Sequence, residues 1–336
     1  MSSNILKQEL KNRVVRNVYL LYGEEDYLKK FYAKKIEEIV LEKDFGDINR
    51  FVIEEPKDVS KIEDLCETLP CFADKKFILV RNSSFFKSTK KEAKLKKEKL
   101  EKLIEILPEY VCLVFVEIEI DKRLKAVKAI EKKGLTVEFG IQGDTVLLKW
   151  VEKEMKKYGK IVHPSVAIKI IQYCDSCMEQ ICTEMEKLRL YVDDREEITD
   201  LDVENVCIKS VNVRIFDLID NISLGRSDLA LKNFRDMLIL KEPVPKIMYM
   251  IIRHVVKLLD MKMLFEEGLG VKDCVSIMKI APYAANKMAG QIKNFDVRTL
   301  KRALKGMLEL DQKIKIGEIK DVLAVEVAIV KLCSLV

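Results

Sequence analysis

The sequence predicts an α/β domain with a parallel sheet, followed by an all-α region that takes up the rest of the chain. Short β-rich apolar runs alternate with segments of helical periodicity as far as residue 143, and the strand signals stop there. The chain has only 12 Gly and 7 Pro among 336 residues, and 34% charged with 49% hydrophobic residues suits amphipathic helices. A chain of this length is expected to form two or three domains.

The first domain is organised around residues 18–40. Residues 18–22 are an apolar run typical of a buried strand, Gly23 breaks the run, and apolar residues then recur at helical spacing. A strand, a turn and a helix in this order is where a nucleotide-binding α/β domain holds phosphate groups. Here the turn carries three acids, at 24–26, with neither a second glycine nor a lysine, so we expect it to repel phosphate. The pattern predicts the fold of an ATPase without its ATP chemistry, although one unit of an unrelated α/β domain fits the same residues.

The remaining elements of this domain follow from apolar runs and the residues that break them. A helix leads in at 1–16; further strands are expected at 51–53, 77–80, 111–116 and 135–139, and further helices at 62–69, 100–107 and 124–133. Strands that alternate with helices indicate a parallel sheet covered on both faces. Residues 81–83, after the third strand, lack the Asp–Glu pair with which an ATPase of this class holds magnesium and activates water.

The region beyond Asp144 reads as two helical domains. Helices are expected at 146–158, 164–174, 178–191 and 200–206, and then at 216–224, 227–240, 244–266, 271–278, 281–293, 296–314 and 321–335. The predicted domains are therefore 1–143 (α/β), 144–211 (small helical domain) and 212–336 (helical bundle).

Charge is unevenly distributed along a chain whose net charge is +5. Residues 87–102 carry eight Lys against three Glu, and residues 212–336 carry 21 Lys and Arg against 15 Asp and Glu. Two basic regions on a near-neutral body indicate a polyanionic partner, with solvated helix faces as the alternative.

The nine cysteines are scattered, mostly within apolar patterns, as expected of small buried side chains kept reduced. Cys174 and Cys177 have CxxC spacing, but no second pair or nearby His completes a zinc site, so a packed helix face is favoured over metal or redox chemistry. No apolar run approaches the ~20 residues that span a bilayer, and residues 1–12 are polar, so we expect a soluble, cytoplasmic protein.

Five motifs, in order and at the right spacing, make the chain resemble one family over nearly its whole length. They are YLLYGEEDYL (19–28), LPCFADKK (69–76), DKRL (121–124), GRSDLAL (225–231) and LDQKIKIG (310–317). They are similar to the delta subunit of the bacterial DNA polymerase III clamp loader.

The resemblance implies an AAA+ module that lacks a functional ATP site, a small helical lid and a collar bundle that holds five loader subunits in a ring. It implies that the protein binds the sliding clamp and holds one clamp interface open, so that the ring closes around primed DNA. The expected partners are the sliding clamp, the other loader subunits and primed DNA within the complex. No active site, cofactor or metal of its own is expected.

The resemblance also points to specific residues. The family's clamp-binding positions correspond to Leu69, Cys71 and Phe72, where an exposed Leu and Phe beside a proline would form an apolar plug for a pocket; the alternative is that both are core residues. Lys313 and Lys315 are expected near primer–template phosphates, with a solvated helix end as the alternative.

Three other functions fit parts of the sequence less well. A self-sufficient NTPase lacks both the lysine and the acidic pair that it needs. A stand-alone, non-sequence-specific DNA-binding protein would use the basic regions, and a degenerate AAA+ adaptor of another complex is a further alternative. The sequence contains no aromatic-rich basic motif that would support base recognition.

Overall fold

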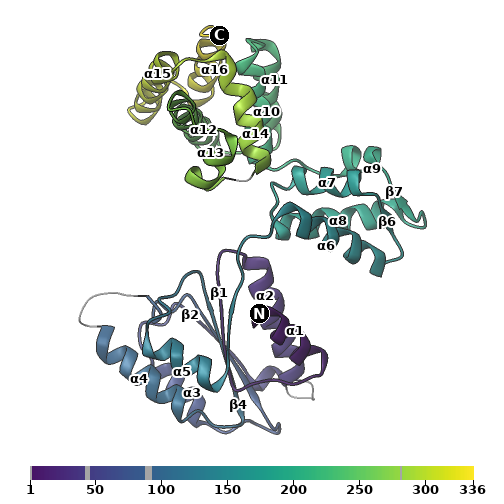
Figure 1. Cartoon of the computed structure of the whole chain (residues 1–336), viewed down its shortest axis with the longest axis vertical. Helices are drawn as coiled ribbons and strands as arrows, with labels where there is room; N and C mark the ends of the chain where they lie inside the picture. Colours follow the sequence, from purple (N-terminus) through teal and green to yellow (C-terminus); the bar gives the residue numbers. More distant parts are fainter. Residues whose placement is uncertain (1, 42–45, 88–92, 281) are drawn as a thin grey trace. The chain divides into compact units, whose positions relative to one another are not determined.

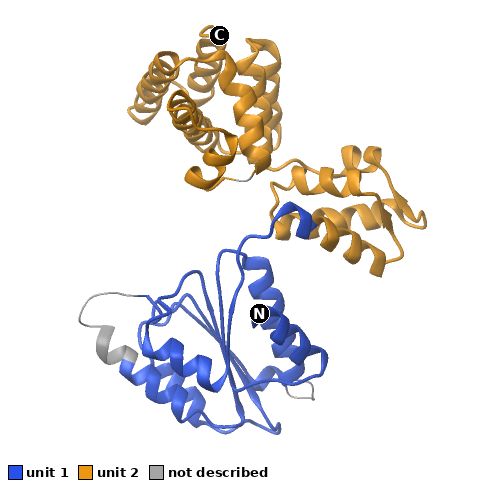
Figure 2. Ribbon diagram, viewed as in Figure 1, with its two compact units in different colours: residues 1–147 blue, residues 148–336 orange. Residues whose placement is uncertain are grey.

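A computed structural model describes residues 2–41, 46–87, 93–280 and 282–336 (Figure 1). The chain divides into two compact units, residues 1–147 and 148–336 (Figure 2). The first unit is a parallel sheet between helices, and the second is almost entirely helical. The α/β-then-α prediction is confirmed.

The sheet of the first unit has five strands, all paired in parallel in the order β2-β3-β4-β1-β5. Their bounds are β1 Val18–Tyr22, β2 Arg50–Glu54, β3 Lys76–Arg81, β4 Val111–Glu117 and β5 Leu135–Glu138. The side chains of β1 are buried throughout, and those of β3 and β4 nearly so, because helices cover both faces. Each strand lies within about one residue of its predicted place.

The strand order decides which face each helix covers. The chain moves one way along the sheet from β1 to β2 and the other way for every later strand, so right-handed crossovers place α2 opposite α3, α4 and α5. One apolar cluster joins α2 and α1 to Tyr19 and Leu21, and another joins α3–α5 to Val18 and Leu20. The helix bounds are α1 Ser2–Lys11, α2 Asp26–Val40, α3 Ser60–Glu67, α4 Ala93–Glu105 and α5 Lys125–Lys133, with a short 3-10 helix η1 at Gly46–Asn49.

The second unit begins with a small group of helices and two short strands, and the strands were not predicted. Its helices are α6 Asp144–Lys157, which starts in the first unit, α7 Pro164–Tyr173, α8 Met178–Val192 and α9 Asp200–Val206. Two short strands, β6 Ile161–Val162 and β7 Glu197–Ile198, pair in parallel, so the expectation of no strands beyond residue 143 is wrong. A two-residue strand is too short to produce a period-2 signal in the sequence.

The helical bundle that follows is packed around one continuous apolar core. Its helices are α10 Val211–Ser223, α11 Ser227–Ile239, α12 Val244–Glu266, α13 Val271–Met278, α14 Pro282–Gln291, α15 Val297–Lys315 and α16 Asp321–Cys333, with a 3-10 turn η2 at Ile292–Asn294. No helix among the described residues is both long and apolar enough to cross a membrane.

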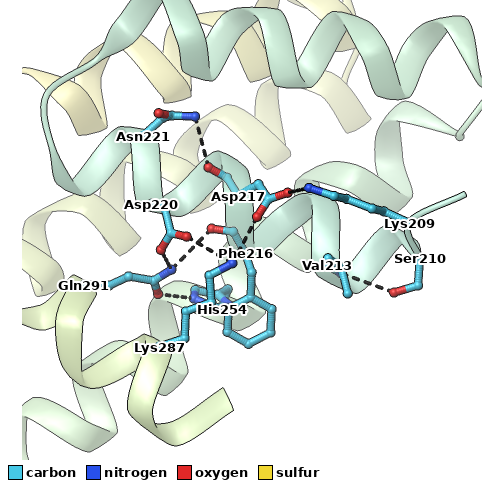
Figure 3. A network of polar contacts seen from close by, with 10 residues as sticks. All are labelled: Lys209, Ser210, Val213, Phe216, Asp217, Asp220, Asn221, His254, Lys287 and Gln291. Carbon is cyan, nitrogen blue, oxygen red and sulfur yellow. Dashed lines mark hydrogen bonds and ion pairs between the residues drawn. The ribbon is translucent and has the colours of Figure 1, made fainter. Parts of the chain in front are cut away.

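A partly buried polar network joins α14 to α10 and α12 in this bundle (Figure 3). The Lys287 ammonium lies 3.0 Å from carboxylate oxygens of both Asp217 and Asp220. The Gln291 side chain donates to Asp220 at 2.5 Å and accepts from His254 Nε2 at 2.8 Å. Burial lowers the pKa of His254 to about 4, so the ring is neutral at physiological pH and its Nε2–H is the donor. The network fixes how these helices pack, and its charged groups stay partly exposed: the side chain of Lys287 is 19% exposed, and those of Asp217 and Asp220 are 31% and 35% exposed.

The lysine-rich tract predicted at 87–102 is described only in part. Residues 88–92 lie outside the described residues, and α4 begins at Ala93, earlier than the predicted helix at 100–107. Residue 281, the first of the predicted helix 281–293, also lies outside them.

Candidate functional site

The segment between α3 and β3, residues 68–75, exposes two large apolar side chains. Leu69 is 76% exposed and Phe72 is 81% exposed, and Cys71 between them is also exposed. The interpretation of Leu69 and Phe72 as core residues is therefore wrong. We call residues 69–72 the tip. Large apolar side chains displayed this fully near the end of a helix are typical of a protein-binding surface.

The backbone of the tip is held by the side-chain amide of Asn49. Asn49 Nδ2 donates to the carbonyl oxygen of Cys71 at 2.8 Å, and the Cys71 N–H donates to Asn49 Oδ1 at 2.7 Å. Asn49 ends η1 and is only 2% exposed, whereas Cys71 is exposed, so this pair of bonds is partly shielded from water. The following Phe72 has a φ of +51°, a left-handed conformation that a non-glycine residue keeps only when its surroundings fix it.

The base of the tip is held by a buried lysine. Lys76, the first residue of β3, is 1% exposed, and its ammonium donates to the carbonyl oxygens of Leu65 and Thr68 and, at 2.8 Å, to Thr68 Oγ1. These carbonyls close α3, where an α-helix lacks internal donors and a cation is favoured. The Tyr110 hydroxyl donates to the neighbouring carbonyl of Cys66 at 3.2 Å. Burial lowers the pKa of Lys76, and the three bonds to its ammonium compensate for the burial of its charge.

The tip and the end of α3 beneath it have a polar inner side and an apolar outer side. The described polar contacts face inward, toward Asn49, Lys76 and Tyr110, while Leu69 and Phe72 face solvent. The tip offers apolar surface in a fixed shape and suits insertion into an apolar pocket of a partner.

The turn after β1, where a nucleotide-binding domain would hold phosphate, is closed by main-chain bonds. Gly23 N–H donates to the carbonyl of Ile118 at 3.1 Å, and Glu25 N–H donates to the carbonyl of Phe139 at 3.0 Å. A phosphate site needs such amides to point at the ligand. Gly23 has a φ of +120°, and a Cβ there would lie 2.2 Å from the Phe139 oxygen, so the adjoining chain leaves room only for glycine.

A lysine does reach this turn, from a position in α2 that the sequence pattern does not reveal. Lys29 of α2 is 1% exposed, and its ammonium donates to the carbonyl oxygens of Gly23 at 2.6 Å and Glu117 at 3.0 Å. Asp26 Oδ1 lies 2.8 Å from the same nitrogen. The charge of Lys29 is therefore used within the chain, beneath the turn.

A buried carboxyl group lies beside this lysine at the end of β4. Glu117 is 2% exposed, and its Oε1 accepts from Ser83 N–H at 2.9 Å and from Ser83 Oγ at 2.5 Å. Burial raises the pKa of Glu117, against the opposing effect of the Ser83 hydrogen bonds. We call Gly23, Lys29, Ser83 and Glu117 the sealed edge, because their polar groups bond to one another or to the main chain.

The other residues singled out in the sequence lie in the second unit. Lys313 and Lys315 are exposed in the last turn of α15, where the helix dipole favours cations, and Lys315 Nζ lies 2.6 Å from Asp311 Oδ2. Cys174 is buried and Cys177 is exposed. Within the described ranges, no group of three or more His, Cys, Asp or Glu residues is arranged to hold a metal ion.

Two family models match the chain. The model of "DNA polymerase III, delta subunit" covers residues 19–140, and the model of "DNA polymerase III delta subunit, C-terminal domain" covers residues 212–332. The chain belongs to the DNA polymerase III delta subunit family. The two matched ranges lie within the first and third predicted domains, while the domain boundaries themselves stay a prediction.

Two relatives of this delta-family chain cover almost all of it. DNA polymerase III subunit delta of Bacillus subtilis (strain 168) is 28% identical over 337 residues, which span 97% of this chain and 95% of the relative. The solved structure of the Bacillus subtilis DNA clamp loader delta protein (YqeN) matches with a TM-score of 0.73 at 26% identity, over 99% of this chain and 100% of that one. The chain is thus similar to a clamp-loader delta protein over almost its whole length, both in sequence and in fold.

Proposed function

We propose that this delta-family chain binds the sliding clamp through Leu69, Cys71 and Phe72 and holds one clamp interface open for loading onto primed DNA. The observation that carries the proposal is the tip, with two large apolar side chains exposed on a backbone that Asn49 and Lys76 hold.

The energetics favour a tip of this kind as the main anchor. Truncation of a well-packed apolar anchor at an interface costs roughly 2 to 4 kcal/mol. A rigid tip also loses little conformational freedom when it binds, so more of that energy appears as affinity. Cys71 contributes less, because its small side chain fills a pocket less completely than a leucine or phenylalanine.

The chain acts without an ATP site or active site of its own. The sealed edge supports this, because Gly23 and Glu25 amides are bonded to carbonyls, and Lys29 is held by the main chain. Isothermal titration of ATP into the isolated chain is expected to give no heat of binding at micromolar concentrations, and a micromolar dissociation constant would contradict the proposal. The ATP dependence of loading then belongs to partner subunits.

The three predicted domains supply the remaining parts of this function. Residues 1–143 carry the tip, 144–211 form the lid and 212–336 form the collar that joins the other loader subunits. Lys313 and Lys315 are assigned weak contacts with primer–template phosphates, which are favourable but independent of base sequence.

The decisive experiment measures clamp capture by this chain alone. The immobilised full chain, without ATP, is expected to retain the purified sliding clamp and to release it after substitution of the tip. Ile106→Ala is the matched control, because Ile106 is a comparably exposed apolar side chain (73%) of the same unit outside the tip. A chain that retains no clamp, or that retains it equally well without Leu69 and Phe72, would not bind the clamp as proposed.

A further inference from the structure

A hollow of about 350 Å³ lies between the last two helices of the chain, α15 and α16. Its floor consists of buried apolar side chains, namely Ala303, Met307, Leu310, Ala328 and Leu332. Its rim carries the exposed side chains of Arg302, Lys305, Glu309 and Lys331. We call this hollow the α15–α16 groove. It combines an apolar floor with a mainly basic rim.

The three cations of the rim outnumber its one acid, Glu309, and Asp296 interacts with Arg302 only at longer range. Arg302, Lys305 and Lys331 form no ion pair with any described residue, whereas Lys315 of the same helix pairs with Asp311 at 2.6 Å. Arg302 and Lys305 are three positions apart on one helix, an arrangement in which like charges weaken the helix by a few tenths of a kcal/mol. An acidic partner would remove this repulsion.

A glycine in the middle of α15 lines the groove, so no side chain projects into the groove at that position. Gly306 lines the groove, and a Cβ added to it would meet no atom of the chain within 4 Å. Glycine in a helix interior costs about 1 kcal/mol relative to alanine. Since packing within this chain does not require glycine there, its absent side chain leaves space for the close approach of a partner.

We propose that the α15–α16 groove receives an amphipathic helix of a neighbouring loader subunit, whose apolar row fills the floor and whose flanking acids pair with Arg302, Lys305 and Lys331. This proposal rests on the assignment of residues 212–336 as the collar. A helix fits because a groove between two helices accepts a row of side chains at i, i+3 and i+4. Nucleic acid fits less well, because its phosphates could pair with the rim cations but would leave the apolar floor unfilled.

The test uses the full chain and the other purified loader subunits. Gly306→Trp fills the groove without changing charge, and Arg302→Glu with Lys305→Glu reverses two charges of the rim. Each is expected to weaken assembly of the loader at least tenfold, and the loss from charge reversal is expected to shrink at high salt. Lys301→Glu is the matched control, since it reverses an exposed charge of α15 outside the groove lining and is expected to stay within twofold of wild type. Thermal unfolding of each variant checks that it is folded. If Gly306→Trp is not folded, the charge-reversed variant alone tests the proposal.

A photo-crosslinking residue at position 306 identifies the occupant in the assembled loader. The expected product joins this chain to a helical segment of a neighbouring subunit that contains Asp or Glu beside apolar residues. Wild-type assembly by the groove variants overturns the proposal. So does a loss of primed-DNA binding without a loss of assembly, which assigns the groove to nucleic acid. A wild-type chain that fails to join the loader at all contradicts the collar assignment instead, and is thereby distinguished from failure of the groove alone.

Discussion

The tip and the sealed edge are each supported by a buried lysine, but they present different side chains to solvent. Each contains a lysine that is 1% exposed and whose ammonium donates to main-chain carbonyls: Lys76 beneath the tip and Lys29 beneath the turn after β1. At the sealed edge, the amides of Gly23 and Glu25 are also bonded to carbonyls of the chain, so these two donors do not point at a phosphate. At the tip, the fixed backbone displays Leu69 and Phe72 to solvent.

The comparison shows that a buried lysine does not by itself mark a ligand site. Removal of an ammonium from water is costly, and carbonyl acceptors offset part of that cost while they fix the local backbone. What the fixed segment does depends on the side chains that it directs outward, acids in one case and apolar groups in the other.

The largest effect is expected from substitutions that remove the apolar side chains of the tip and leave the sealed edge unchanged. Leu69→Ala combined with Phe72→Ala should weaken clamp binding by a factor of about 1000 or more, from a nanomolar to a micromolar complex, because each anchor contributes roughly 2 to 4 kcal/mol. The melting temperature should change little, since both side chains are exposed. Titration of the clamp and thermal unfolding measure the two quantities. A double variant that melts much earlier than wild type would show that these residues support the fold.

The second prediction separates the two lysines. Lys76→Met and Lys29→Met should each lower the free energy of unfolding by about 3 kcal/mol, because each leaves buried carbonyls without a donor. Only Lys76→Met should also lower clamp affinity, by about tenfold, since it releases the base of the tip. Denaturant unfolding and clamp titration of both variants test this. An equal loss of clamp affinity in the two variants would mean that the tip and the edge are not independent.

A smaller effect is expected from the amide that holds the tip backbone. Asn49→Ala removes both hydrogen bonds to Cys71 and should cost about 1 to 2 kcal/mol of stability and about tenfold in clamp affinity. Asn49→Asp keeps an acceptor for the Cys71 N–H but offers no donor to the Cys71 carbonyl, so its affinity should lie between those of wild type and Asn49→Ala. If clamp titration gives wild-type affinity for Asn49→Ala, the tip does not need this support.

The smallest effect concerns pH at the sealed edge. Burial raises the pKa of Glu117 above its usual 4.5, so the folded protein holds this proton to a higher pH than the unfolded chain does. Stability from this group is therefore present at low pH and is lost as pH rises from about 4.5 through the folded pKa. Glu117→Gln should raise the free energy of unfolding at pH 7 by on the order of 1 kcal/mol and flatten its pH dependence in this window. Denaturant unfolding at pH 4 to 8 measures this, and a variant less stable at pH 7 would show that the Glu117 charge is favourable.

The five strands of the large sheet and the helices that follow one another along the chain could be predicted from the sequence, because buried strands and amphipathic helices leave periodic apolar patterns within short segments. It also predicted the exposed Leu69 and Phe72 as the binding residues, from a motif shared with a family, and the acids that make the turn after β1 unsuitable for phosphate. Each of these features is local in the chain.

The polar side chains that hold those features in place could be identified only in the folded chain. Asn49 reaches Cys71 across 22 positions, and Lys29 reaches the Glu117 carbonyl across 88. The α15–α16 groove likewise depends on side chains of two helices that meet only in the folded bundle. A lysine that donates to distant carbonyls has the same sequence signature as a lysine in water. The difference is the burial and the set of acceptors that the fold supplies.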